Sequence, residues 1–171
     1  MRLFIAIDIP KDISQELREF QREFKGLAKI KMVSTFHLTL KFLGDVEKDK
    51  VDEIKRRLKE ISFDPFDLVL EDVGVFPDEN NMKVIWVGAL SKEVNDLQGN
   101  IDEKLSDLFP RDERFHSHLT LGRVKLVKKK EELKEKLKLK YSNIFKVDNF
   151  KLILSYPNKG TYKYKVLEIF S

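Results

Sequence analysis

The sequence predicts an α+β protein with two lobes related by a pseudo-twofold axis, in which two antiparallel or mixed sheets face a central cleft and the helices lie outside. Three observations support this. Predicted strands and helices alternate along the chain without a long linker. One tetrapeptide occurs twice, as His37-Leu38-Thr39-Leu40 and His118-Leu119-Thr120-Leu121. Each copy lies on a predicted strand flanked by helices. We therefore expect residues 1–171 to form a single bilobal domain in which each lobe carries one motif (37–40 and 118–121).

The first quarter of the chain predicts three strands and a helix. Residues 2–9 form an apolar strand that Pro10 closes. A helix follows from about residue 12 to residue 28, with apolar side chains at helical spacing. Residues 30–33 and 36–43 have the composition of short strands, the second of which contains the first motif.

The middle of the chain predicts a helix and a hairpin. Residues 47–61 combine a charged face with an apolar face, which is the pattern of an amphipathic helix. Residues 66–76 and 83–90 are predicted to be strands. The segment 77–81 between them, Pro-Asp-Glu-Asn-Asn, consists of turn-forming residues, and we expect a hairpin here.

The remainder predicts two helices and three strands. Helices are expected at 92–108 and 129–139, and a strand at 116–123 carries the second motif. Two long strands, 145–156 and 162–170, are expected to complete the chain.

Composition limits the functions that the chain can have. Apolar residues make up 42% of the 171 positions, which is ample for a core. The chain has no Cys, which excludes disulfides, zinc–thiolate sites and a cysteine nucleophile. It is rich in Lys and Glu, a composition typical of thermophile proteins. The net charge of +4 permits an anionic ligand. No apolar run is long enough for a signal peptide or a membrane span, so we expect a cytoplasmic protein.

The repeated tetrapeptide suits acid–base chemistry at phosphorus. With three His and four Thr in the chain, two His-x-Thr matches have a chance on the order of one in a thousand. Alternate residues of a strand share a face, so His37 and Thr39 project together, as do His118 and Thr120. An in-line displacement needs a base at the attacking oxygen and an acid at the leaving oxygen, on opposite sides of the phosphorus.

Two imidazoles from facing lobes meet that requirement, and the two Thr hydroxyls can donate to the non-bridging oxygens. Two His on different lobes, without a linked carboxylate motif, are a poor set of metal ligands. We therefore expect neither a metal nor another cofactor. The alternative is a purely structural role, in which the two tetrapeptides are similar because both form amphipathic strands.

These residues resemble the 2H phosphoesterase superfamily and, within it, the RNA 2′,3′-cyclic phosphodiesterases, also called 2′-5′ RNA ligases. The resemblance covers nearly the whole chain. It is carried by four segments, Leu3 to Pro10, His37 to Val46, His118 to Arg123, and Ser155 to Gly160 together with Tyr162.

The resemblance implies hydrolysis of RNA 2′,3′-cyclic phosphate ends, tRNA fragments among them, to 2′-phosphomonoesters, with no membrane and no protein partner. It makes His37 the proton donor and His118 the proton acceptor, with Thr39 and Thr120 holding the phosphate. It also implies that Arg123 and Phe42 bind substrate.

Strand parity conflicts with the last two assignments. It sends Phe42 to the core side with Leu38 and Leu40, and it separates Arg123 from His118 unless the strand bends at Gly122. His116 has the parity to lie beside His118, as a surface or supporting residue.

Three rival functions use the same sequence differently. A 2′-5′ RNA ligase would use the same four residues in the reverse reaction, although abundant water favours hydrolysis. Another 2H esterase would act on a small cyclic nucleotide. A non-catalytic RNA-binding module would need stacking aromatics and a basic stripe, and it would leave both His-Thr pairs unexplained.

Overall fold

The computed structural model describes all residues from 1 to 171 and confirms the α+β class with two antiparallel sheets. Four α-helices, two short 3₁₀ helices and nine strands follow one another along the chain. Their bounds are β1 Arg2–Asp8, α1 Lys11–Phe20, η1 Gln21–Phe24, β2 Ala28–Met32, β3 His37–Asp45, η2 Lys48–Lys50, α2 Val51–Leu58, β4 Phe66–Asp78, β5 Asn81–Leu90, α3 Lys92–Lys104, β6 His118–Val127, α4 Lys130–Leu137, β7 Ser142–Val147, β8 Phe150–Asn158 and β9 Thr161–Phe170.

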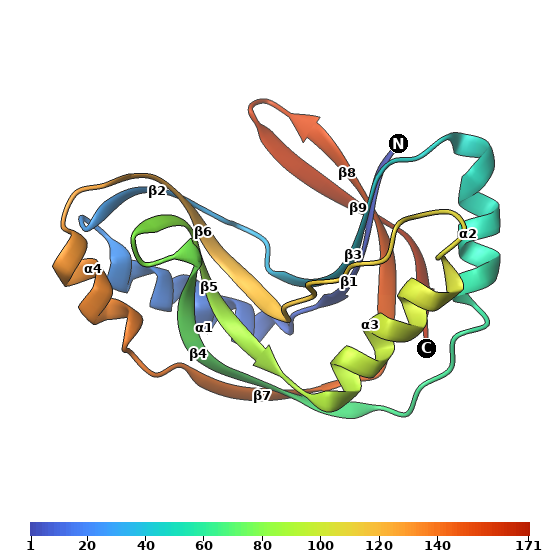
Figure 1. The fold of residues 1–171 in the computed structure, drawn as a ribbon, viewed down its shortest axis with the longest axis horizontal. Coiled ribbons are helices and arrows are strands. Elements are labelled where there is room, and N and C mark those ends of the chain that lie inside the picture. Colours follow the sequence, from blue (N-terminus) through green and yellow to red (C-terminus); the bar gives the residue numbers. More distant parts are fainter.

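The two sheets stand side by side and form an arch (Figure 1). Sheet A has the strand order β3-β1-β8-β9 and sheet B the order β2-β6-β5-β4-β7, and every pairing is antiparallel. Helices α2 and α3 lie beside sheet A, and α1 and α4 lie beside sheet B (Figure 1). One continuous apolar core of 39 buried residues lies under both sheets.

The chain passes between the two sheets several times, so neither sheet belongs to one half of the sequence. Helix α1 follows β1 of sheet A, yet its Glu16 accepts a 2.7 Å hydrogen bond from Asn143 on β7 of sheet B. Helix α3 follows β5 of sheet B, yet it packs against β3. These crossings hold the two sheets together as one unit.

Two predicted elements differ most from the structure. The first helix ends at Phe20 and gives way to a 3₁₀ turn, and Ala28 already belongs to β2. The predicted strand 145–156 is in fact two strands, because β7 pairs with β4 in sheet B and β8 pairs with β1 in sheet A. Asp148 and Asn149, which are good turn formers, lie at the crossing point.

The strands that carry the two motifs have the same pattern of burial. Leu38, Leu40, Leu119 and Leu121 are all at most 1% exposed and face the core, as strand parity predicts. The His and Thr between them are half-buried and face the opposite side. None of the helices combines the length and the apolar character needed to cross a bilayer.

Candidate active site

Each motif strand contains a β-bulge directly after its Thr. In the β1–β3 register, Ala6 pairs with Thr39 and Ile5 with Lys41, so Leu40 is the extra residue. In the β5–β6 register, Trp86 pairs with Thr120 and Ile85 with Gly122, so Leu121 is extra. An extra residue reverses the parity of everything that follows it. The bulge therefore changes which side chains share a face with each His.

The bulge explains why the strand-parity prediction for Phe42 was wrong. Phe42 is 74% exposed, and its ring centroid lies 6.2 Å from that of Phe4, which in turn lies 4.9 Å from the His37 ring. Lys41 is the residue that turns inward instead. Phe42 thus shares the open face of sheet A with His37 and Thr39.

The same device places Arg123, which is exposed, on the open face of sheet B. Gly122 occupies the bend, where a Cβ atom would come within 2.5 Å of Ile30 Cγ2 and 3.3 Å of the Lys31 carbonyl oxygen. Only glycine allows β2 to approach this closely. The carbonyl of the bulged Leu121 accepts a 2.8 Å hydrogen bond from the buried Gln21 side chain. The expected bend at Gly122 is therefore present.

His37 lies among aromatic rings on the open face of sheet A. Its ring centroid is 4.9 Å from that of Phe4 and 5.0 Å from that of Tyr164, which meets it edge-on at 81°. Burial lowers the pKa of His37 below 6.5, and the negative charge of Asp8 acts in the opposite direction. Asp8 is the register partner of His37 on β1. This His therefore has an anionic neighbour that favours its protonated form.

His118 has a fixed orientation and a cationic neighbour, Arg123. Its Nδ1 lies 2.6 Å from the carbonyl oxygen of His116, and a carbonyl can only accept, so Nδ1 carries the proton. In the neutral ring, Nε2 is then left as a proton acceptor. Burial lowers the pKa of His118, the bond to His116 raises it, and the charges of His116 and Arg123 lower it. The balance favours the neutral form.

An aromatic wall surrounds His118 as well. The His118 ring lies 4.9 Å from Phe76, edge-on, and 6.3 Å from Trp86, while the His116 ring packs 4.7 Å from Trp86. Gly74 makes room for the indole, because a Cβ atom there would meet Trp86 Cζ2 at 2.1 Å. Sequence reasoning missed Phe76, Trp86, Phe4 and Tyr164, since nothing in their local pattern indicates these contacts.

The two motif strands approach each other where the sheets meet. Some Cα atoms of β3 lie within 8 Å of Cα atoms of β6. The segment before β3 runs along β6, and the Val33 amide donates a 3.1 Å bond to the Leu121 carbonyl. The fold therefore brings close to each other two strands of similar pattern, each with one imidazole, one hydroxyl and flanking aromatic rings.

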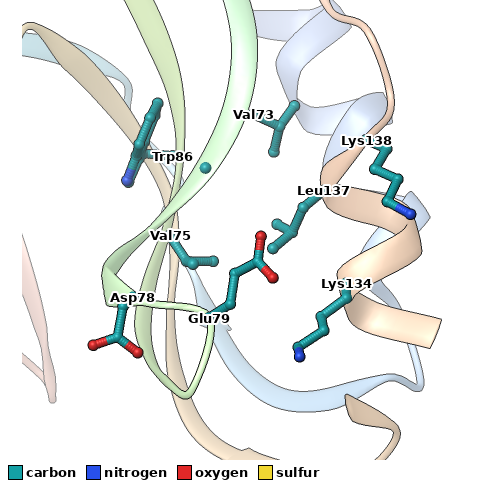
Figure 2. A pocket seen from close by; sticks show the side chains of 9 residues that line it. Val73, Val75, Asp78, Glu79, Trp86, Lys134, Leu137 and Lys138 are labelled. Atoms are coloured by element: carbon teal, nitrogen blue, oxygen red, sulfur yellow. The ribbon is translucent and has the colours of Figure 1, made fainter. Parts of the chain in front are cut away.

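A separate hollow of about 370 Å³ opens between the β4–β5 hairpin and α4 (Figure 2). Glu79 of the hairpin points toward α4, which carries Lys134 and Lys138. The lining includes no His and no Thr, and it shares only Trp86 with the surroundings of His118. This hollow is therefore separate from the two tetrapeptides. The structure also has no group of three or more His, Cys, Asp or Glu side chains that could hold a metal ion.

Comparisons with known proteins agree with the duplicated geometry. A profile of the LigT like phosphoesterase family matches twice, at residues 7–86 and 87–162. The RNA 2′,3′-cyclic phosphodiesterase of Methanocaldococcus jannaschii is 39% identical over an alignment of 172 positions, and the alignment covers 95% of this chain and 97% of that protein.

Two solved structures have the same fold. The crystal structure of the Thermus thermophilus protein TT0787 superposes with a TM-score of 0.87 at 24% identity, covering 99% of this chain and 97% of that one. Escherichia coli LigT complexed with 3′-AMP gives a TM-score of 0.80 at 23% identity, covering 99% and 96% of the two chains.

Proposed function

Because this chain belongs to the LigT-like phosphoesterase family, we propose that it hydrolyses RNA 2′,3′-cyclic phosphodiester ends to 2′-phosphomonoesters. The observation that carries the proposal is the pair of matching half-sites on β3 and β6. The name of the Methanocaldococcus jannaschii relative supports the reaction class. The 3′-AMP bound by Escherichia coli LigT supports a nucleotide as the ligand. Fragments of tRNA are one source of such ends.

The charges around the two His support different roles for them. His118, held through Nδ1 and flanked by His116 and Arg123, is the base and takes a proton from water at Nε2. The oxygen of that water forms a bond to phosphorus as the bond to the ribose 3′ oxygen breaks. His37, beside Asp8, is the acid and gives its proton to the 3′ oxygen. Exchange with solvent then resets both rings.

Four further residues complete the proposed site. The hydroxyls of Thr39 and Thr120 donate to the non-bridging oxygens, where charge builds in the transition state. Arg123 adds positive charge near the phosphate, and Phe42 offers a ring on which the terminal base can stack. In this arrangement the open faces of the two sheets line one cleft, and the chain acts as one bilobal domain.

The proposal predicts how kcat/KM depends on pH. The base must be neutral and the acid protonated, so kcat/KM is bell-shaped and its maximum lies midway between the two pKa values of the free enzyme. Burial lowers both pKa values from 6.5. We therefore expect the maximum of kcat/KM below pH 6.5, measured with a nucleoside 2′,3′-cyclic phosphate at constant ionic strength. A rate that rises steadily to pH 10 would instead indicate attack by hydroxide without a His base.

The reaction itself is tested by product analysis. RNA ending in a 2′,3′-cyclic phosphate is incubated with the protein in EDTA, and the product is identified by phosphorus NMR. We expect a 2′-phosphomonoester at an undiminished rate. A 3′-phosphate would reverse the roles of His37 and His118, and rescue by a divalent ion would overturn the two-histidine scheme. Adding an RNA with a 5′-hydroxyl tests the ligase alternative, for which a 2′-5′-linked product is diagnostic.

A further inference from the structure

The β8–β9 hairpin extends beyond the body of the protein, past the start of β1 (red in Figure 1). Its outer part, residues 155–165, contains three Lys and no acidic residue. It also exposes three tyrosines, because Tyr156, Tyr162 and Tyr164 are 39%, 52% and 41% exposed. Core packing does not account for these rings, and their exposure indicates an interaction surface.

The pairing register separates the tyrosines onto two faces. Tyr164 pairs with Ser155, which pairs in turn with Arg2, so these three lie in one row across β9, β8 and β1. Tyr162 stands two residues further along β9 and shares their face. Tyr156 pairs with Lys163 and points to the opposite face. Two of the three tyrosines therefore lie on one side.

That side is the one that carries His37. The Tyr164 ring contacts both His37, at 5.0 Å, and Phe4, at 5.7 Å between centroids. The guanidinium carbon of Arg2 lies 5.7 Å from the Tyr162 ring centroid, which is cation–π distance. Arg2, Tyr162 and Tyr164, named here the hairpin strip, thus continue the open face of sheet A outward from the candidate active site.

We propose that the hairpin strip binds the RNA strand on the 5′ side of the nucleotide that carries the cyclic phosphate. The inference rests on the proposed function, because it places the phosphate between His37 and His118. A cyclic phosphate ends the RNA at its 3′ terminus, so the rest of the strand must leave the site from the 5′ side. Aromatic rings beside cations are the groups on which single strands stack and pair their phosphates. The absence of acidic residues in 155–165 suits an anionic strand.

The two faces of the hairpin provide a matched experiment. Tyr162→Ala removes a ring from the strip, and Tyr156→Ala removes a ring of similar exposure from the opposite face. The kcat/KM for a pentanucleotide ending in a 2′,3′-cyclic phosphate is divided by that for the mononucleotide. Stacking is worth about 1–3 kcal/mol per base, so we expect Tyr162→Ala to lower this ratio about tenfold. We expect Tyr156→Ala to leave the ratio unchanged and Tyr162→Phe to retain it.

A binding measurement separates this inference from the proposed function. A fluorescein-labelled pentanucleotide with a 2′-phosphate end is titrated with each variant at several salt concentrations. We expect Tyr162→Ala to weaken binding about tenfold and Arg2→Gln to reduce the dependence on salt. If Tyr162→Ala weakens binding but the unmodified protein does not hydrolyse the cyclic phosphate, the proposed function is refuted and the binding role of the hairpin strip is still supported. If the two Tyr→Ala variants weaken RNA binding equally, or if neither weakens it, the proposed binding role of the hairpin strip is refuted.

Discussion

His118→Ala is expected to lower kcat/KM for an RNA 2′,3′-cyclic phosphate by about 10³- to 10⁴-fold, within the range that a positioned base contributes. The side chain is half-buried on the open face of sheet B, so its removal opens no cavity in the core. We therefore expect the melting temperature to change little. His118→Asn is the matched variant, because its amide can still donate to the His116 carbonyl but cannot take up a proton. If His118→Asn kept activity, the imidazole would be a structural group and the assigned role would be wrong.

His37→Ala is expected to lower kcat/KM on RNA as much as His118→Ala does. Its loss of activity should, however, depend on the leaving group of the substrate. An acid matters only when the leaving oxygen needs a proton, and p-nitrophenolate does not. On a p-nitrophenyl phosphodiester, we expect His37→Ala to retain far more of the unmodified protein's activity than His118→Ala does. The comparison tests the division of roles inferred from Asp8 on one side and Arg123 on the other. Equal losses in the two variants would contradict that division.

The local sequence predicts the inner geometry of each half-site well, because strand parity alone places His37 with Thr39 and buries Leu38 and Leu40. That parity fails at the bulge. The alternation of polar and apolar residues does not indicate that Leu40 is an extra residue, because a bulge is defined by the pairing with the partner strand. Phe42 is exposed as a result. Gly122 was a usable signal in the second motif, whereas Lys41 stands at the matching position of the first.

The outer parts of the site depend on contacts between distant segments. Phe76 and Trp86 reach His118 only because β4, β5 and β6 pair in one register. Tyr164 reaches His37 only because β8 returns to sheet A. The merging of β7 and β8 into one predicted strand concealed that return. The hydrophobic periodicity of a strand does not indicate which sheet the strand joins. These contacts could therefore be identified only from the structure.

A buried ion pair fixes the first motif strand to α3. Lys41 Nζ donates to Asp102 and also to the Pro110 carbonyl oxygen at 2.7 Å, and its side chain is 3% exposed. Asp102 also accepts bonds from Gln98 Nε2 at 2.9 Å and from the Asp112 amide at 2.8 Å. Burial raises the pKa of Asp102, but these donors outweigh it and hold the pKa below 3.8. The stabilisation is therefore present at neutral pH and is lost as the pH falls below that value.

Lys41→Met is accordingly expected to cost about 3–5 kcal/mol in the free energy of unfolding, measured by urea denaturation at pH 7. The variant leaves the Asp102 carboxylate buried without its cation, whereas Lys41→Met combined with Asp102→Leu removes both charges. Because replacing a whole buried pair is often close to neutral, we expect the double variant to recover most of the loss. Recovery of stability need not restore activity, since Lys41 follows the bulge that turns Phe42 toward the open face. A single variant as stable as the unmodified protein would mean that the pair does not anchor β3. A stable double variant with a raised KM would show that the ion pair positions the motif strand as well as holding it.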